Sequence, residues 1–429
     1  MNGRPLRRLL VDGRVLDDRY HGIGRTTQAI LRALPQAAPD LEVEVLVHSR
    51  QRSTRFPLAE AIEANGARRL LFDHPLTSPR QWAAWPRLLS RTTADAVLLP
   101  YHLAGPIGPR RGGGRARSTR STRTPRPDVF TIVHDCIIEA DPGFAPDRRT
   151  RLLYPLVTRA VLAGGVSVLT PSAASAREIA HRYGVQVPDE HVIGWGVEEA
   201  FTRLGVAPSP VSDLPAGVPA RYLLHVGARR PHKDVETAVR ALTELDDDVH
   251  LVLVGSGDPR WDDPVPAVAA GLGVAHRVLH LSSVSEEQLR ALYSHAHAFV
   301  YPSLVEGFGL PLLEAMAARV PVVASDVPVF REIAGDAVGY FTPRSPGELA
   351  AAVRRLDDAA ARARALDAGS ALAAAATWEA SVTKLLRAMG VSAPDDVAGV
   401  HGCGPDLISA PHPPHAPPVP PTTRPQRRG

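Results

Sequence analysis

Two glutamates around a glycine turn have the residue types and spacing best suited to bind a hydroxyl-rich ligand. Glu306 opens the segment Glu-Gly-Phe-Gly-Leu-Pro, and Glu314 follows within the next helical pattern. Glycine at 307 and 309 lets the backbone approach a ligand closely, and Pro311 fits the first turn of a helix. The amides that begin such a helix face outward and bind anions or hydroxyls. We therefore predict a site that holds two sugar rings through these carboxylates and amides.

An isolated lysine in an arginine-rich chain marks a second candidate group. Lysine occurs only as Lys233 and Lys384, although Lys and Arg together number 49. Lys233 follows an apolar run in His-Val-Gly-Ala-Arg-Arg-Pro-His-Lys and precedes an expected helix. A compact ammonium is a common point-charge partner of a phosphate. We predict that Lys233, with Arg229 or Arg230, neutralises a diphosphate; an exposed basic helix start is the alternative.

Two motifs in the N-terminal half could complete this site. Gly22 and Gly24 precede an expected helix over 25–34, and they would bring the backbone and that helix N-terminus close to phosphates. His134 and Asp135 follow an apolar run. The imidazole could donate to a sugar hydroxyl, and the carboxylate could orient the ring or cap the next segment. A plain strand-to-helix turn and a buried structural histidine are the alternative interpretations.

The elements that must position these residues follow an alternating pattern. Short β-branched runs alternate with amphipathic segments, which is typical of parallel sheets covered by helices. Strands are expected over 9–11, 43–47, 96–99, 129–133, 167–170, 222–226, 249–254, 278–281, 298–301 and 320–324. Helices are expected over 25–34, 81–89, 147–162, 172–183, 234–245, 285–293, 310–318, 329–333 and 346–356. The sequence thus predicts an α/β protein with two doubly wound domains, whose ligands lie beyond the carboxyl ends of the strands.

Composition shifts divide the chain into domains and irregular segments. Four prolines between residues 206 and 219 predict a linker. Arginine with Gly, Ser and Thr, or a high proline content, predicts disorder in two other segments. The expected order is an N-terminal domain over 1–205 with a disordered basic insertion at 108–128, the linker 206–219, a C-terminal domain over 220–375, a helix over 376–391 and a disordered tail over 392–429.

Composition also limits the class of protein. The chain has 429 residues, 44% of them hydrophobic and 22% charged, which is ordinary for a soluble protein of two or three domains. The formal charge of +4 does not require nucleic acid, because much of the excess lies in irregular segments. Aromatic residues make up 5% of the chain, and none lies between the arginines of 110–126. This pattern argues against nucleic-acid binding.

The number of cysteines, one acidic run and the length of the apolar runs exclude further classes of protein. Cys136 and Cys403 are too few for a disulfide framework or a four-cysteine zinc site. The acidic run 246–248 precedes a strand, at the end of the sheet away from the expected ligands, so we predict no metal site. No apolar run has the length of a signal peptide or a membrane-spanning helix. We therefore expect a cytoplasmic protein that rests, at most, on the inner face of a membrane.

Four segments together resemble the family-4 group of retaining glycosyltransferases, which have the GT-B fold. Residues 306–314 are similar to the paired-glutamate motif of that family, and residues 226–233 are similar to its diphosphate-binding motif. Residues 21–26 resemble the glycine loop of its N-terminal domain, and residues 134–135 resemble its His-Asp turn. The resemblance runs from about residue 9 to about residue 389, and the paired glutamates are its most specific part.

The resemblance implies two Rossmann-like domains that face each other across a cleft and transfer a hexose with retention of configuration. Similarity to bacterial mannosyltransferases favours mannose, a GDP- or UDP-linked donor, no further cofactor, and a glycan or lipid-linked glycan as acceptor. Glu306 would bind the transferred sugar, Glu314 the ribose, and His134 would lie beside the reacting carbon. The backbone expected to assist Glu306 belongs to Gly307, Phe308, Gly309 and Leu310.

The sequence leaves other functions open. Ala228 stands where many family members have arginine, which would suit a non-catalytic sugar-nucleotide-binding protein. Phosphorylases and sugar-nucleotide epimerases share the same fold. The arginines of 110–126 could attract anionic lipid headgroups to the acceptor domain, or they could form an idle solvated loop.

Overall fold

The computed structural model describes residues 6–18, 21–53, 62, 66–76, 78–105 and 126–391. Most of the basic insertion and the whole tail over 392–429, both predicted to be disordered, lie outside these described residues. The predicted insertion extends too far at its C-terminal end. Asp128 begins a strand whose next four residues are buried, so residues 126–128 belong to the described structure.

The N-terminal lobe contains a parallel sheet with the strand order β3-β2-β1-β4-β5-β6. This order is that of a doubly wound dinucleotide-binding sheet. The predicted strands of this half are confirmed; β3, an exposed edge strand, was not predicted. The strands are β1 (Arg8–Asp12), β2 (Glu42–Val47), β3 (Arg68–Leu71), β4 (Ala96–Leu99), β5 (Asp128–Ile132) and β6 (Ser167–Leu169).

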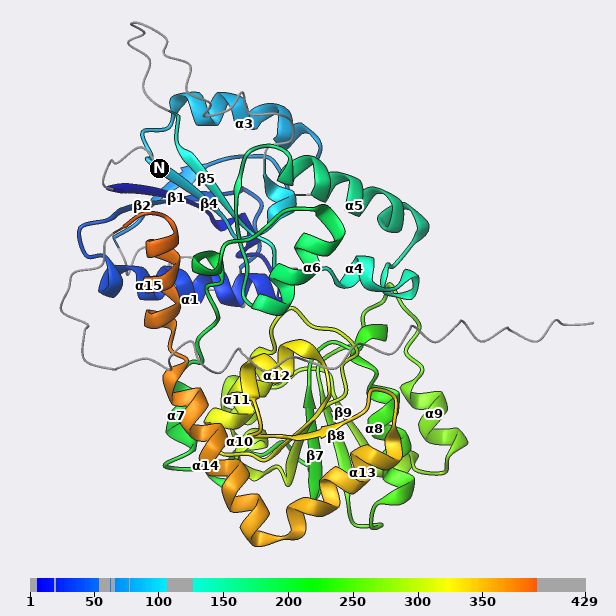
Figure 1. The fold of residues 1–429 in the computed structure, drawn as a ribbon. Coiled ribbons are helices and arrows are strands. Elements are labelled where there is room, and N and C mark those ends of the chain that lie inside the picture. The colour runs from blue at the N-terminus through cyan, green and yellow to red at the C-terminus, as the bar shows by residue number, and fades with distance from the viewer. Residues whose placement is uncertain are drawn as a thin grey trace, which may run out of the picture. The chain divides into compact units, whose positions relative to one another are not determined.

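The C-terminal lobe repeats the same order in a second parallel sheet, β12-β11-β10-β7-β8-β9. The predicted strands are again confirmed, and the short strand β12 was not predicted. The strands are β7 (Tyr222–Val226), β8 (His250–Val254), β9 (Val278–Leu281), β10 (Ala298–Tyr301), β11 (Val322–Ser325) and β12 (Gly339–Phe341). The chain is therefore α/β with two doubly wound sheets, as the sequence predicts (Figure 1).

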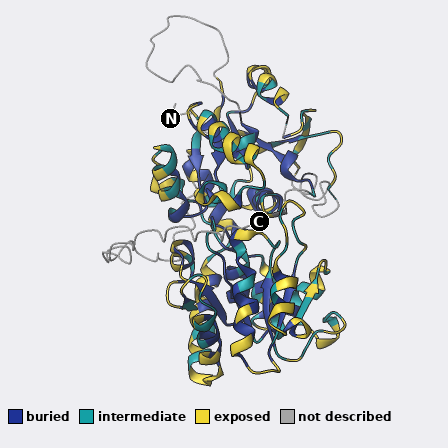
Figure 2. Ribbon diagram, turned by 90° about the vertical axis from the view of Figure 1, so that its right-hand side faces the viewer, coloured by how far each residue is buried: buried dark blue, intermediate teal, exposed yellow. Residues whose placement is uncertain are grey.

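Helices cover the sheets, and every predicted helix is present with shifted ends. Those that follow strands of the first half are α1 (His21–Ala37), α3 (Arg80–Arg91), α4 (Ile137–Ala140), α5 (Arg148–Leu162), α6 (Ala173–Tyr183) and α7 (Glu199–Leu204). Those of the second half are α8 (Val235–Ala241), α9 (Val265–Gly271), α10 (Glu286–His295), α11 (Leu310–Ala317), α12 (Pro328–Ala334), α13 (Pro346–Arg354), α14 (Ala359–Ala375) and α15 (Trp378–Ala388). Figure 2 shows buried residues concentrated along the strands.

The last helix returns to the first lobe. Trp378, Val382 and Leu385 of α15 pack in one buried cluster with Ile30 and Leu34 of α1. The helix before it, α14, packs instead on α11 of the second lobe, where Ala373 joins the buried cluster around that helix. The apolar face of α15 thus explains why the chain crosses back after the second sheet (Figure 1).

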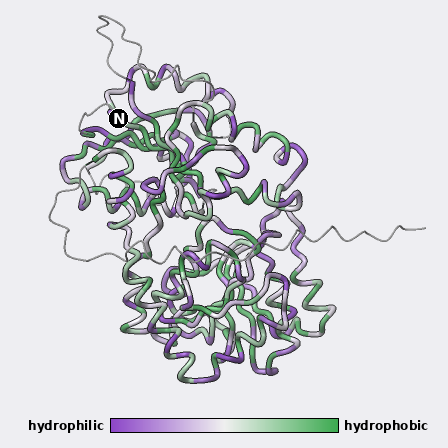
Figure 3. The backbone as a smooth tube through the Cα atoms, in the orientation of Figure 1, coloured by the Kyte–Doolittle hydropathy of each residue, from purple (hydrophilic) through white to green (hydrophobic). Residues whose placement is uncertain are grey.

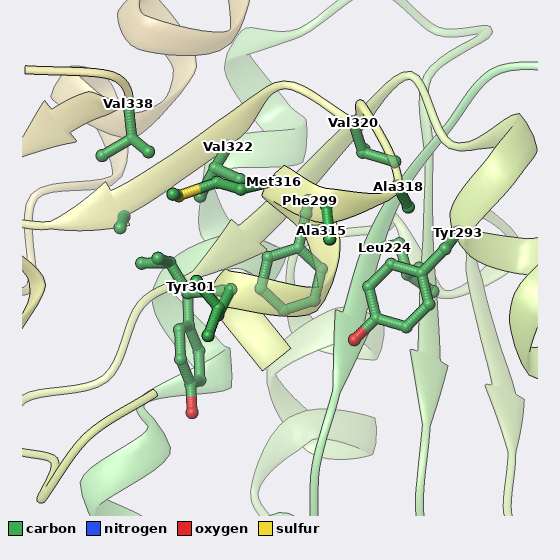
Figure 4. Packing of buried hydrophobic residues seen from close by; sticks show 14 of the residues in the cluster. Leu224, Tyr293, Phe299, Tyr301, Ala315, Met316, Ala318, Val320, Val322 and Val338 are labelled. Carbon is green, nitrogen blue, oxygen red and sulfur yellow. The ribbon is translucent and has the colours of Figure 1, made fainter. Parts of the chain in front are cut away.

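An aromatic cluster beneath α11 supports the region that carries the paired glutamates. Tyr293 and Phe299 stack with ring centroids 5.7 Å apart, and Tyr301 stacks on Phe330 at 4.8 Å. Figure 4 shows Tyr293, Phe299 and Tyr301 in the same buried cluster as Met316 of α11. Because a well-packed core holds its side chains in fixed rotamers, this cluster fixes the position of α11. None of the helices within the described ranges combines the length and hydrophobicity needed to span a bilayer.

Candidate functional site

The helix that carries the paired glutamates begins as predicted. Gly309 precedes α11 with φ of +134°, a conformation that glycine adopts readily and other residues rarely do. Pro311 lies in the first turn, where a missing N–H costs little. Glu306 lies in the turn after β10, and Glu314 lies inside the helix. Residues 302–309 therefore connect the carboxyl end of β10 to a helix N-terminus, a position suited to binding anions and hydroxyls.

Lys233 and Glu306 form an ion pair. The Lys233 Nζ lies 2.6 Å from Glu306 Oε1 and donates to the Tyr301 hydroxyl at 3.2 Å. Both side chains are largely buried, with 14% and 9% exposed. Burial raises the pKa of Glu306, but the Lys233 ammonium and His232 outweigh it, so this pKa lies below its ordinary value. The predicted phosphate-binding cation and the predicted sugar-binding carboxylate thus meet, because β7 and β10 are neighbours in the sheet.

Glu314 is paired on both of its oxygens. Arg25 Nη1 lies 2.7 Å from Glu314 Oε1, and the Tyr293 hydroxyl donates to Oε2 at 3.0 Å. Arg25 also contacts Glu198, with 2.9 Å between Nε and Oε1. Burial raises the pKa of Glu314 above its ordinary value, although Arg25 and Tyr293 oppose the shift. The carboxylate predicted to bind a ribose is therefore buried against a guanidinium from the other lobe.

The two glycines of the N-terminal motif lie within α1, not before it. The helix begins at His21, so Gly22 and Gly24 occupy its first turn. The prediction that the helix starts at residue 25 was wrong: the helix includes both glycines, although glycine has a low helix propensity. The first amides of α1 still lack intrahelical acceptors, so an N-terminal anion site remains a feature of this segment. Arg25 follows these glycines directly, and its pairing with Glu314 was missed.

The two arginines near Lys233 differ in their surroundings. Arg229 is largely buried; its Nε lies 2.5 Å from Asp263 Oδ2, and Nη1 donates to the Gly255 carbonyl at 2.6 Å. Arg230 is more exposed, with Nε 3.0 Å from Asp258 Oδ2. Of the two, Arg230 has the more exposed side chain, so it is the better candidate to contact a ligand.

His134 is a partly buried, neutral imidazole. Its Nε2 lies 2.7 Å from the Pro100 carbonyl, which can only accept, so Nε2 carries the proton. Burial lowers the pKa of His134, with the Pro100 carbonyl and Asp135 opposing the shift. The ring therefore has no proton left to donate from Nδ1, and the predicted donation to a sugar hydroxyl does not fit this tautomer. Nδ1 is instead an acceptor.

Asp135 caps the following segment, which is one of the two interpretations made from the sequence. Its Oδ1 accepts from the Ile137 amide at 3.0 Å. Burial raises the pKa of this carboxyl, and the nearby charge of Glu306 acts in the same direction. The hydrogen bonds of the described residues include none between Asp135 and His134 side chains, so the orienting role is not supported.

Gly307 brings the two lobes into direct contact. A Cβ at this position would lie 2.0 Å from the His134 carbonyl oxygen and 2.8 Å from Asp135 Cβ. The Gly307 carbonyl accepts from Ser172 Oγ at 2.7 Å and from Ser175 Oγ at 3.0 Å. Phe308 packs against buried clusters of both lobes, and Leu310 packs against the N-terminal one. The predicted residues of the two halves are thereby gathered at one place.

Metal ligands do not gather in this region. Within the described ranges, His, Cys, Asp and Glu side chains form no group of three that could hold a metal ion. The acidic run 246–248 pairs with arginine instead: Arg221 Nη1 lies 3.2 Å from Asp246 and 3.4 Å from Asp248. The absence of a metal requirement stays a prediction.

Comparison with known proteins agrees with this arrangement. The fold and the gathered residues define a protein of the GT-B type, and a family model described as "Glycosyl transferases group 1" matches residues 214–368. O-antigen chain mannosyltransferase B of Escherichia coli is 30% identical over 269 residues, which cover 61% of this chain and 69% of that protein. The chain therefore belongs to the group 1 glycosyltransferase family.

Two further comparisons cover different shares of the molecule. O-antigen chain mannosyltransferase RfbU of Salmonella typhimurium is 35% identical over 136 residues, but these span only 32% of this chain and 38% of that protein. Sucrose-phosphate synthase from Thermosynechococcus elongatus has a similar fold, with a TM-score of 0.64 and 21% identity over 90% of this chain and 98% of that one. This structural likeness extends the GT-B fold over nearly the whole chain, including the N-terminal lobe.

Proposed function

We propose that this glycosyltransferase moves a hexose, with mannose favoured, from a GDP- or UDP-linked donor to a hydroxyl of a glycan or lipid-linked glycan. The observation that carries the proposal is the Lys233–Glu306 pair at the N-terminus of α11, against the His134-Asp135 turn. The names of the related mannosyltransferases support mannose and a surface polysaccharide as product.

Each residue has a proposed role in donor binding. Glu306 accepts hydrogen bonds from hydroxyls of the transferred sugar, assisted by the amides that begin α11. Lys233 and Arg230 neutralise the diphosphate, and the first amides of α1 around Gly22 and Gly24 face its oxygens. Glu314 accepts from the ribose hydroxyls, for which Arg25 must share or release Oε1.

The proposed reaction needs no enzymatic nucleophile. The acceptor oxygen attacks the anomeric carbon on the face that the diphosphate leaves, so configuration is retained. The bond from the anomeric carbon to the phosphate oxygen breaks with its electron pair going to the diphosphate, and an oxygen of that diphosphate takes the acceptor proton. Lys233 and Arg230 stabilise the growing negative charge. We propose that they replace a metal ion, so the chelator EDTA should leave the transfer rate unchanged.

The two lysines of the chain allow a matched test of the proposed charge role. Lys233→Ala should lower the transfer rate about 100-fold, the cost of one preorganised charge donor. Lys384→Ala, at an exposed position of α15, removes the same charge and should leave the rate unchanged. Glu306→Gln should also lower transfer. Near wild-type rates for both Lys233→Ala and Glu306→Gln would reject the assignment.

Donor identity is tested by thermal shift. The donor binds the native state and raises its unfolding temperature by mass action. A GDP-mannose shift larger than those of UDP-glucose and UDP-galactose would support mannose. Binding without turnover on any acceptor would instead favour a sugar-nucleotide-binding protein. A requirement for inorganic phosphate would identify a phosphorylase, and turnover without an acceptor would identify an epimerase.

The proposed lipid contact of the arginines in 110–126 lies outside the described residues, and deletion of this segment tests it separately.

A further inference from the structure

The helix α5 presents an unusual outer face. Its sequence, Arg-Arg-Thr-Arg-Leu-Leu-Tyr-Pro-Leu-Val-Thr-Arg-Ala-Val-Leu, has four arginines and no acidic residue. Leu152, Leu153 and Leu156 are 67%, 44% and 58% exposed. In the described part of the chain, no other helix exposes so many large apolar side chains. Figure 3 shows hydrophilic and hydrophobic residues side by side along this helix.

Core packing does not explain the leucines. The inner face of α5 is already formed by Thr158, Val161 and Leu162, which are its buried residues. The three leucines therefore lie on the solvent side, in addition to the apolar residues of the inner face, which is unusual for a surface helix. Contiguous exposed apolar residues with a polar border mark an interaction surface.

Helix stability does not explain the arginines either. Arg148, Arg149 and Arg151 lie in the first turns of α5, where the positive end of the helix dipole disfavours cations. None of the three forms an ion pair with a carboxylate among the described residues, and all three are exposed. The nearest acid in sequence, Asp147, accepts from the Thr150 amide at 2.6 Å as the helix N-cap. The charges thus remain available to an external anion.

A groove beside the helix adds room for a headgroup. It has a volume of about 480 Å³, and its lining includes Arg151, Arg159 and Arg182 together with Glu139. Arg182 donates from Nη1 to the Glu139 carbonyl at 2.8 Å, and Arg159 lies over the ring of Tyr183. Arg182 also pairs with Glu178, with 2.8 Å between Nε and Oε2. Among the described residues, Arg151 and Arg159 of α5 therefore supply the unpaired positive charge along this groove.

We propose that α5 docks the protein on an anionic lipid bilayer, with Leu152, Leu153 and Leu156 among the acyl chains and Arg148, Arg149 and Arg151 at the headgroups. Basic and apolar side chains on one short helix match the interface of an anionic membrane. A second copy of this chain fits the surface poorly, because like charges would oppose each other across the contact. The inference does not rest on the sugar or donor proposed above.

Co-sedimentation of the full chain with vesicles tests the proposal. Wild-type protein should bind phosphatidylcholine vesicles that contain phosphatidylglycerol, and it should bind pure phosphatidylcholine much less. The triple variant R148Q/R149Q/R151Q should bind about tenfold or more weakly. The double variant L152S/L156S should also lose most binding, including at a salt concentration that screens surface charge.

Matched controls remove the same groups elsewhere on the N-terminal lobe. The variant R80Q/R87Q/R91Q takes three exposed arginines from α3, and L71S takes an exposed leucine from β3. Both should bind vesicles as wild type does. Unfolding temperatures of all variants identify any that are misfolded, and for such a variant L156A provides a milder change at the same face.

Several outcomes would overturn the proposal. These are absence of wild-type binding to the anionic vesicles, unchanged binding of both α5 variants, or equal loss in the α3 control. Loss of all binding on deletion of 108–128, with α5 intact, would assign the membrane contact to that segment instead. A wild-type dimer that L152S/L156S converts to a monomer would show that the leucines form a contact between copies.

Discussion

Arg25 and Glu314 join the first helix of one lobe to the paired-glutamate helix of the other, with 2.7 Å between Nη1 and Oε1. Glu314 is almost completely buried, whereas Arg25 retains 29% exposure. Burial lowers the pKa of Arg25, but Glu314 and Glu198 outweigh it, so the guanidinium stays charged. The proposed ribose-binding carboxylate is thus neutralised by its own chain, and the proposed donor site includes a contact between the lobes.

Removal of the Arg25 charge should destabilise the fold in a pH-dependent way. Arg25→Gln leaves a buried carboxylate without a counter-charge, which costs about 3 kcal/mol in the free energy of unfolding. Burial already raises the folded-state pKa of Glu314, so the contribution of this group to stability falls as pH rises through that pKa. Without Arg25 the pKa rises further. The loss of stability relative to wild type should therefore be larger at about pH 8 than at about pH 5.

Urea unfolding at both pH values measures this difference. Glu198→Gln is the control, because it removes the other carboxylate of Arg25 at a site with 38% exposure. Its effect should stay below about 1 kcal/mol. Equal destabilisation of Arg25→Gln at the two pH values would mean that the titration of Glu314 does not contribute to the loss of stability.

The sequence predicted the fold well because buried parallel strands have a strong signal. Strands covered on both faces are continuous apolar runs, as in β4 and β10. The missed strand β3 is an exposed edge with the sequence Arg-Arg-Leu-Leu, and β12 has only three residues. The helix α14 was missed because its alanine-rich sequence has no apolar stripe at helical spacing.

The site was predicted only in part, because motifs do not report contacts between distant segments. Lys233 and Glu306 were recognised by residue type and local context, and the structure pairs them. The Arg25–Glu314 contact depends on how α1 meets α11, which no local pattern encodes. The tautomer of His134 depends on the Pro100 carbonyl, which belongs to a different strand end. Arg25, which directly follows Gly24, was the sequence feature that could have suggested the contact with Glu314.

A side chain at residue 307 should disturb the lobe contact and the reaction together. Gly307→Ala places a Cβ 2.0 Å from the His134 carbonyl, so backbone must move. Overpacking of this kind costs about 1–3 kcal/mol in stability. Transfer should fall more than donor affinity, because Glu306 and His134 are forced apart. Gly271→Ala is the control: nothing lies within 4 Å of its Cβ, and it should be neutral or slightly stabilising. Wild-type stability and transfer in Gly307→Ala would show that the lobes separate freely here.

The two neighbouring arginines should separate into different roles. Arg230→Gln should lower kcat/KM about tenfold, since one partly exposed charge is lost from the proposed diphosphate site. Arg229→Gln should instead lower the unfolding free energy by about 1–3 kcal/mol, because Asp263 and the Gly255 carbonyl lose their donor. Kinetics and thermal unfolding of both variants measure the contrast. A large loss of transfer with unchanged stability in Arg229→Gln would mean that Arg229, and not Arg230, contacts the diphosphate.

Two substitutions at His134 should separate its chemical role from its structural one. Burial lowers the pKa of His134, so the ring is neutral at neutral pH, with Nε2 donating to Pro100 and Nδ1 left as acceptor. His134→Gln keeps an amide donor near the Nε2 position but removes the acceptor at Nδ1, whereas His134→Asn does the reverse. If Nδ1 accepts a hydrogen bond from a sugar or acceptor hydroxyl, Asn should retain more transfer and Gln more stability. The comparison of kcat with unfolding temperature decides this. Higher transfer in the Gln variant would mean that the contact with Pro100, which positions the turn beside Gly307, is the only role of this histidine.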